Sequence, residues 1–220
     1  MKKTWMAICA AAFFTLGGSA LAEQPGLSSS ADGIRTEEAS RAIINAKYPV
    51  LTEGAVLRRA WINAAIEVEV AGFYENLEKQ NQIAPVNGWV TYLVGRQDET
   101  YVSLVLLESV MHKGAAHPST VVKGMTFDKA GNQISRKQIL TMLPMKAGEN
   151  IDRQVKEQAA SRGISLFSDA DAKVWPKEFF IGTDGHVHFI FQQYDIAPYA
   201  AGWIAIDAGA LPAVDPASHP

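Results

Sequence analysis

Four of the five histidines stand where an imidazole could do chemistry. His186 and His188 alternate along an apolar run, so in a strand they share one face about 7 Å apart, a separation that lets two imidazoles meet one metal ion. His112 or His117 could add a third ligand. No HExxH-type signature accompanies these histidines. We therefore expect no metal and no other cofactor, and interpret His186 and His188 as polar residues of an edge strand.

His117 deserves separate consideration because it follows a glycine turn, Gly114-Ala115-Ala116, and precedes Pro118. A residue before proline favours an extended backbone, which could fix the direction of the imidazole ring. Histidine titrates near neutral pH and also serves as a hydrogen-bonded structural residue. Both a structural role and a ligand contact stay open for His117 at this point.

The serines and acidic pairs give little support for hydrolysis. Ser103, Ser109 and Ser119 lack the Gly-x-Ser-x-Gly setting of a nucleophile, and Asp169 and Asp171 lie in a polar Ser-Asp-Ala-Asp-Ala stretch typical of a solvated loop. The sequence predicts no catalytic residue. An envelope hydrolase or metal-dependent enzyme that uses the histidines is the alternative.

A second group of residues could bind a ligand through aromatic rings. The segment from Tyr194 to Gly202 reads Tyr-Asp-Ile-Ala-Pro-Tyr-Ala-Ala-Gly, and Trp203 follows it. Amphipathic rings are common at binding hot spots, so Tyr194 and Trp203 are candidates for contact with a glycan or a partner, although a place in the core is equally compatible. Pro198 and Tyr199 are better explained as the turn that ends a hairpin and seats the last strand.

The first 22 residues have the pattern of a secretory signal peptide. Lys2 and Lys3 precede an apolar stretch, and Ala20-Leu21-Ala22 is a small-x-small cleavage site. The single cysteine, Cys9, lies inside this segment, so the expected mature chain has no disulfide, thiol nucleophile or cysteine-bound metal. We expect a protein exported by the Sec pathway to the periplasm or the medium, with no membrane span in the mature chain.

Charge and length narrow the class of partner. The 220-residue chain has a formal net charge of −3, which becomes −5 when Lys2 and Lys3 are removed with the signal. An acidic chain does not favour nucleic acid or an anionic membrane surface as its partner. A length of this size is typical of one domain with its own core.

The order of elements predicts the fold class. Residues 23–40 are rich in Ser, Gly and Pro at their start and are expected to be a flexible leader. A strand at 41–49 and a long helix at 54–82 follow, the helix being predicted from apolar residues at helical spacing that include Leu57, Trp61 and Val68. The remaining expected elements are strands at 89–96, 101–111 and 119–127, helices at 135–143 and 150–162, and strands at 179–181, 187–191 and 203–206.

This order does not alternate between strands and helices, so it predicts an α+β fold: an antiparallel β-sheet packed by one long N-terminal helix and two shorter helices. Asp184 and Gly185 form the turn of the last hairpin, with glycine where a positive φ is needed. The expected single domain covers residues 41–207, and residues 208–220, which are rich in proline and alanine, are expected to be a frayed tail.

Several landmarks together resemble the extracytoplasmic domain family shared by the anti-sigma-V factor RsiV (C-terminal domain) and the peptidoglycan deacetylase PdaC (N-terminal domain), a family of unknown function. The similarity runs from about Arg41 to Ile206. Its sharpest parts are the corner from Gly114 to Pro118, where the family usually has Gly-Gly-Ala-His, and the Tyr194 to Gly202 segment. The other landmarks are Lys47-Tyr48-Pro49, Ile62-Asn63, Phe127-Asp128 with Gly131, and Phe179-Phe180 with Asp184-Gly185.

The resemblance implies an α+β domain outside the cytoplasmic membrane with no established enzymatic activity. One branch of the family binds lysozyme and another accompanies a cell-wall deacetylase. The sequence lacks the membrane span and sigma-binding region of the first and the catalytic domain of the second, so signalling by proteolysis is not expected. We expect a non-enzymatic binding module of the cell envelope that recognises a lysozyme-like protein or a peptidoglycan fragment through His117, Tyr194 and Trp203.

Overall fold

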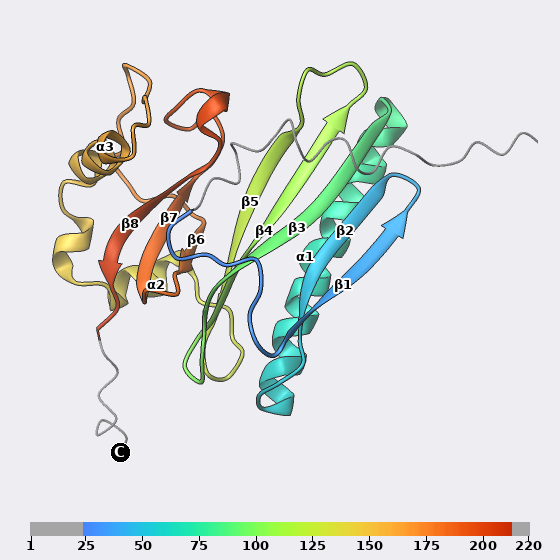
Figure 1. The fold of residues 1–220 in the computed structure, drawn as a ribbon, viewed down its shortest axis with the longest axis horizontal. Helices are drawn as coiled ribbons and strands as arrows, with labels where there is room; N and C mark the ends of the chain where they lie inside the picture. The colour runs from blue at the N-terminus through green and yellow to red at the C-terminus, as the bar shows by residue number, and fades with distance from the viewer. Residues whose placement is uncertain (1–23, 213–220) are drawn as a thin grey trace, which may run out of the picture.

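The structure, a computed structural model, describes residues 24–212 and contains two β-sheets (Figure 1). The large sheet has the strand order β1-β2-β3-β4-β5, and the small sheet has the order β6-β7-β8. The strands are β1 (Ile34–Arg41), β2 (Ile44–Leu51), β3 (Val86–Gln97), β4 (Val102–His112), β5 (Ser119–Phe127), β6 (Phe179–Ile181), β7 (His186–Phe191) and β8 (Ile204–Ala210). The helices are α1 (Val56–Ile83), α2 (Arg136–Met142) and α3 (Ile151–Ser161), with short 3-10 helices at Met145–Gly148 and Tyr199–Ala201.

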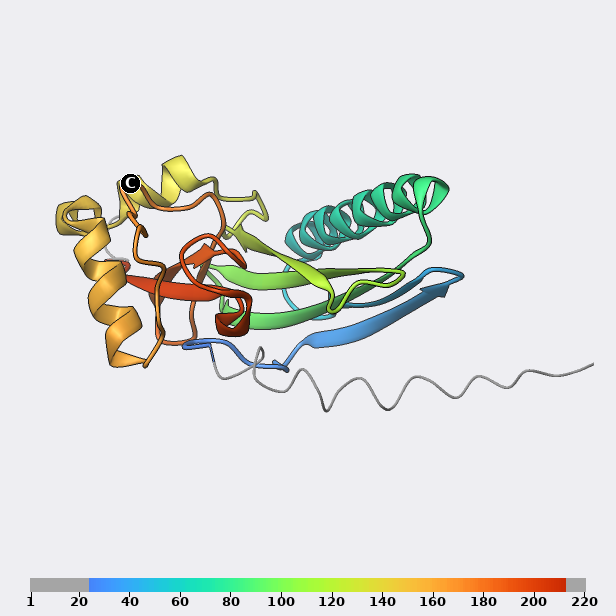
Figure 2. The same ribbon diagram turned by 90° about the horizontal axis from the view of Figure 1, so that it is seen from above.

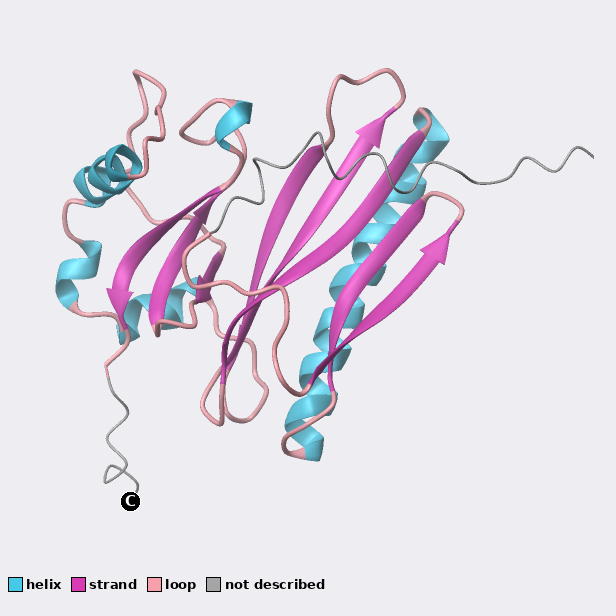
Figure 3. Ribbon diagram, in the orientation of Figure 1, coloured by secondary structure: helices cyan, strands magenta, loops and turns pink. Residues whose placement is uncertain are grey.

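The α+β class is confirmed, and two details differ from the expected single antiparallel sheet. The strands form two sheets (Figure 3), and β2 and β3 pair in parallel because α1 connects them as a crossover. Every other pairing is antiparallel. Within residues 24–212, none of the helices is both long enough and apolar enough to span a bilayer.

Helix α1 lies along one face of the large sheet (Figure 2). Its buried residues recur every three or four positions and pack on the inward side chains of β3, β4 and β5; they are Ile62, Ile66, Val70, Phe73 and Leu77. The expected core face was wrong in part, because Leu57, Trp61 and Val68 point to solvent. The two apolar stripes lie beside each other on the helix, and spacing alone does not say which of them meets the sheet.

The small sheet packs on the opposite face of the large sheet. Phe180, Ile190 and Trp203 form a core cluster with residues of β4 and β5, while the other face of the small sheet is covered by α2 and α3. Strand β6 runs so close to the large sheet that a Cβ on Gly124 would overlap the backbone of Phe179. Glycine at this position is therefore what allows the two sheets to join.

The predicted flexible leader, residues 23–40, was wrong for the part that the structure describes. Ser28 exchanges two backbone hydrogen bonds with Val94, at 2.8 and 2.7 Å, and Gln24 donates to the Trp203 carbonyl. Residues 34–41 form β1, a polar edge strand whose backbone is paired by β2. Backbone pairing does not require apolar side chains, so composition alone gave no sign of this strand.

The predicted tail, residues 208–220, begins too early, since β8 continues to Ala210. The backbone amide of Leu211 also donates to the Gly185 carbonyl. The predicted signal peptide, residues 1–22, and the end of the chain, residues 213–220, lie outside the described residues.

Candidate functional site

Two loops far apart in sequence meet to form a small aromatic surface. The β4–β5 loop contributes His117, and the β7–β8 loop contributes Tyr194 and Tyr199. The His117 ring stacks on Tyr199 with centroids 3.7 Å apart and planes inclined by 22°, and the Tyr194 ring lies 5.9 Å from that of Tyr199. The Tyr199 hydroxyl donates to the Pro118 carbonyl, 3.2 Å away. We call His117, Tyr194 and Tyr199 the aromatic surface.

Two glutamines hold the β7–β8 loop against the edge of β5. The Gln192 side chain accepts from Val122 N and donates to Val122 O, both at 2.8 Å, which imitates a neighbouring strand. Gln193 accepts from Thr120 N at 3.0 Å. These bonds satisfy backbone groups that an edge strand would leave open, and they fix the start of the loop that carries Tyr194.

Tyr194 has the unusual combination of exposure and backbone strain. Its φ is 68° and its exposed fraction is 55%. A left-handed conformation costs a residue with a Cβ about 1–2 kcal/mol, and such strain gathers at functional sites. The turn is kept in place by Asp195, whose carboxylate accepts from Gln192 N at 2.7 Å. The fold therefore holds the Tyr194 ring in solvent although its backbone conformation is unfavourable in free energy.

Trp203, which we expected at the binding surface, is instead a core residue. Its exposed fraction is 2%, and it lies between the two sheets with Val122 and Ile190. Its indole N–H is buried and has no hydrogen-bond partner among the described residues. Gly202, with φ 67° and ψ −149°, makes the turn that sends the next side chain inward.

The residues predicted to shape the corners lie in or beside turns of the chain. Pro198 precedes the 3-10 helix Tyr199–Ala201. Gly114 and Gly185 have φ values of 86° and 80°, and Gly185 N closes the hairpin turn on the Gly182 carbonyl. Asp184 lies in that turn and accepts from His186 N at 3.0 Å.

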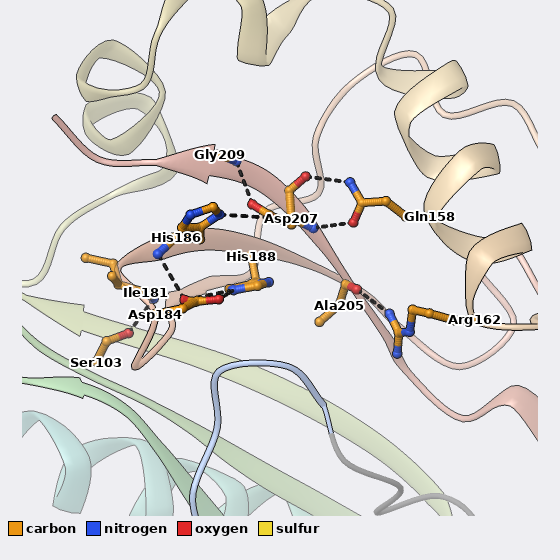
Figure 4. Close-up of polar contacts among 10 residues, drawn as sticks. All are labelled: Ser103, Gln158, Arg162, Ile181, Asp184, His186, His188, Ala205, Asp207 and Gly209. Atoms are coloured by element: carbon orange, nitrogen blue, oxygen red, sulfur yellow. Dashed lines mark hydrogen bonds and ion pairs between the residues drawn. The ribbon is translucent and has the colours of Figure 1, made fainter.

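His186 and His188 are held by two different aspartates (Figure 4). His186 Nδ1 lies 2.8 Å from Asp207 Oδ2, and His188 Nε2 lies 3.2 Å from Asp184 Oδ2. The two ring centroids are 6.5 Å apart, close to the spacing expected of strand neighbours. Among residues 24–212, no three His, Cys, Asp or Glu side chains are arranged to hold a metal ion.

His188 is sealed between the sheets, with 1% of its surface exposed and its ring stacked on Phe180. Burial lowers its pKa, and the nearby Asp184 carboxylate opposes that effect only in part. The pKa of Asp184 is lowered although burial acts to raise it, because His186 N donates to it and His188 lies beside it. Burial thus favours a neutral, structural imidazole.

The serines also have structural contacts. Ser103 Oγ accepts from Ile181 N at 2.8 Å and shares a hydrogen bond of the same length with Thr126 Oγ1, so it ties β6 to the large sheet (Figure 4). Ser109 pairs with Thr120 Oγ1 across β4 and β5. Both hydroxyls are used to join strands.

One charged cluster was missed in the sequence. Glu108 is buried on the α1 face of β4, and one of its carboxylate oxygens has no hydrogen-bond partner among the described residues. Burial, followed by the charge of Glu69, raises the pKa of Glu108 to about 7 although Lys123 opposes the shift. The neighbouring groove has a volume of about 760 Å³ and includes Glu69, Lys123 and Glu178. The available signal was a single acid in the apolar run of β4.

Comparison with known proteins places these features in context. A family model matches residues 126–207. That family is described as "Protein of unknown function (DUF3298)", and the matched segment runs from the end of β5 through most of β8. A comparison with curated proteins finds no match.

Two solved structures share the fold at low sequence identity. A DUF3298 family protein from Pseudomonas aeruginosa is 16% identical, with a TM-score of 0.54 over 81% of this chain and 91% of the other. A DUF3298 protein from Bacteroides fragilis is 14% identical, with a TM-score of 0.50 over 84% of this chain and 90% of the other. These similarities concern architecture. The likeness to RsiV and PdaC stays a prediction from sequence.

Proposed function

We propose that this protein is an exported, non-enzymatic binding module of the cell envelope that recognises a cell-wall glycan through its aromatic surface. The observation that carries the proposal is Tyr194, a ring held out in solvent in a left-handed conformation beside Tyr199 and His117. Export is proposed from the signal-like pattern of residues 1–22.

The chemistry of the surface suits a sugar. The faces of hexose rings carry C–H groups that pack on aromatic rings, while tyrosine hydroxyls and imidazole nitrogens can bond sugar hydroxyls. Tyr199 is fixed by the stack with His117 and the bond to Pro118, so little side-chain freedom is lost there on binding. Tyr194 is the ring most free to adjust to a ligand.

Isothermal titration calorimetry with a tetramer of N-acetylglucosamine tests the proposal. Wild-type protein should bind, Tyr194→Ala should weaken binding about tenfold or more, and Tyr194→Phe should retain most of the affinity because the ring is kept. Trp61→Ala removes another exposed aromatic ring, on α1, and should leave binding unchanged.

Absence of sugar binding by the wild type, or equal binding by Tyr194→Ala, would overturn the proposal. A parallel titration with lysozyme at moderate salt tests the other expected partner, a lysozyme-like protein. Binding of lysozyme but not sugar, lost in Tyr194→Ala, would show a protein-recognition surface in place of a glycan site.

A further inference from the structure

Helix α1 presents apolar residues on its solvent face as well as on its core face. Leu57, Trp61 and Val68 keep 75%, 67% and 71% of their surface exposed. Ala64 and Ala71, which lie on the same side of the helix, are also exposed. Isolated exposed apolar residues are ordinary, but a continuous line of them indicates an interaction surface.

The spacing of these five residues identifies the kind of surface. Along the chain they are separated by four, three, four and three positions. This is the 3.5-residue repeat of a helix that packs lengthwise against another helix. Within the chain, the large sheet is met by the neighbouring stripe that includes Ile62, Ile66 and Val70. We call the five exposed residues the α1 seam.

We propose that the α1 seam pairs with the α1 seam of a second copy of this chain, with the two helices antiparallel about a two-fold axis near Ala64. In this arrangement Trp61 lies opposite Val68 of the second copy, and Leu57 lies opposite its Ala71. Large residues then meet smaller ones, and alanine meets alanine at the centre. Each contact away from the axis occurs twice, and the contact between the two Ala64 residues lies on the axis and occurs once, as a two-fold interface requires.

Charge on α1 selects the antiparallel direction. The first eight residues of α1 contain Arg58 and Arg59 and no acid, whereas residues 64–72, the rest of the span that overlaps in the antiparallel pair, contain Glu67 and Glu69 and no basic residue. Parallel pairing would set like charges side by side, and antiparallel pairing sets opposite charges together and opposes the helix dipoles. The two arginines donate to the carbonyls of Asp98 and Thr52, and neither forms an ion pair with a carboxylate among the described residues.

Trp61 is positioned to be the anchor of this interface. The turn around Gly131 lies against the helix there, close enough that a Cβ on Gly131 would come within 3.3 Å of Trp61 Cβ. A tryptophan on a fixed backbone loses little freedom on binding and is among the residues enriched at hot spots. The exposed Ala60 and Gly72 beside the seam leave room for the helices to approach.

Sedimentation equilibrium over a range of protein concentrations tests the association. The wild type should dimerise, and Trp61→Ala should raise the dimer dissociation constant at least tenfold while keeping the wild-type circular dichroism spectrum. Val68→Ser is the second variant, with a smaller rise in the same direction. Tyr194→Ala, which removes an exposed ring elsewhere, should dimerise as the wild type does. A wild type that stays monomeric, or a dimer unaffected by both α1 changes, would overturn the proposal.

Single cysteines test the direction in a full chain that carries Cys9→Ser. Ala64→Cys should form a disulfide between two copies under mild oxidation. Ala71→Cys should not, because in the antiparallel pair its two copies are about 21 Å apart along the axis, fourteen residues at 1.5 Å each. A disulfide from Ala71→Cys would show a parallel pair and overturn the arrangement. Failure of Ala64→Cys to cross-link a chain that dimerises would overturn the seam itself.

Discussion

The small sheet is tied to its covering helix by side-chain hydrogen bonds to its backbone as well as by an apolar core, whereas α1 is held to the large sheet mainly by apolar packing. On the small sheet, Gln158 of α3 exchanges two hydrogen bonds with the Asp207 backbone, at 2.9 and 2.7 Å, and Arg162 donates to the Ala205 carbonyl (Figure 4). Its core stacks Trp175 on Phe189 with centroids 4.8 Å apart.

Helix α1 is attached differently. Its contact with the large sheet is an apolar core, supplemented by Asn63, which bonds both backbone groups of Leu51. On its outer side Leu57, Trp61 and Val68 remain exposed. The match to the family of unknown function covers residues 126–207, which includes most of the small-sheet half and leaves α1 outside. Whether an apolar residue of α1 is buried or exposed therefore depends on where the sheet lies, which the type and spacing of the residue do not determine.

The largest loss of stability is expected from a substitution at the contact between the two sheets. Gly124→Ala should destabilise the protein by about 3 kcal/mol or more, because the new Cβ would overlap the Phe179 backbone. Gly72→Ala, in α1 with open space around it, should instead stabilise the monomer by about 0.5–1 kcal/mol. Chemical denaturation measures both. Equal stability of the two variants would mean that the sheets are not joined as described.

The next largest effect distinguishes the buried face of α1 from its exposed face. Ile66 is fully buried and Trp61 is mostly exposed. Ile66→Ala should cost about 3–4 kcal/mol of unfolding free energy. Trp61→Ala should change it by about 0.5 kcal/mol or less when measured at concentrations where the protein is monomeric. A large loss for Trp61→Ala in the monomer would mean that the ring packs in the core, contrary to its exposed position.

Glu108 makes the α1 half sensitive to rising pH. Its pKa is about 7 in the folded protein against an ordinary value of 4.5. The folded state therefore holds a proton that the unfolded state releases, so stability falls as the pH rises from 4.5 through 7. Glu108→Gln should remove this loss and stabilise the protein at pH 8 by up to about 3 kcal/mol, with little effect at pH 4.5. Denaturation of the wild type and of Glu108→Gln at the two pH values measures this difference. An equal effect of the substitution at both pH values would contradict a raised pKa for Glu108.

His188 should give the small-sheet half a weaker dependence of the opposite sign. Its pKa is lowered from an ordinary value of 6.5. Below that pH the imidazole is therefore protonated in the unfolded chain while it stays neutral in the folded protein. Stability is then lost as the pH falls below 6.5. His188→Asn should flatten the fall between pH 6.5 and 5, while Glu108→Gln should leave this contribution in place. An unchanged slope in His188→Asn would show that the buried imidazole is protonated in the fold.

Elements with a strong pattern were predictable from the sequence. The long helix, the β3–β4–β5 meander, the α2 and α3 helices and the last hairpin follow from apolar periodicity, proline stops and glycine turns. Strand β1 was missed because its residues, Ile-Arg-Thr-Glu-Glu-Ala-Ser-Arg, are those of a polar edge. The division into two sheets depends on close backbone approach at Gly95 and Gly124, which no periodicity reveals.

The candidate site was predictable as a segment and less so as individual side chains. His117 and Tyr194 do lie near each other through Tyr199, which the sequence had assigned to a turn. The Trp203 side chain lies in the core because the turn at Gly202 determines which side chains of the following segment point inward. Glu108 was overlooked because one acid in an apolar strand has no spacing to mark it, and its significance depends on Glu69 and Lys123, which come from other elements.

The most direct test of the proposed function is a nuclear magnetic resonance titration of isotope-labelled protein with the N-acetylglucosamine tetramer. We predict that the amide signals that shift on binding belong to residues 113–118 and 192–202, the two loops that form the aromatic surface. Shifts confined to the groove beside Glu69 and Lys123, or to α1, or no shifts at saturating sugar, would contradict a glycan site at the aromatic surface.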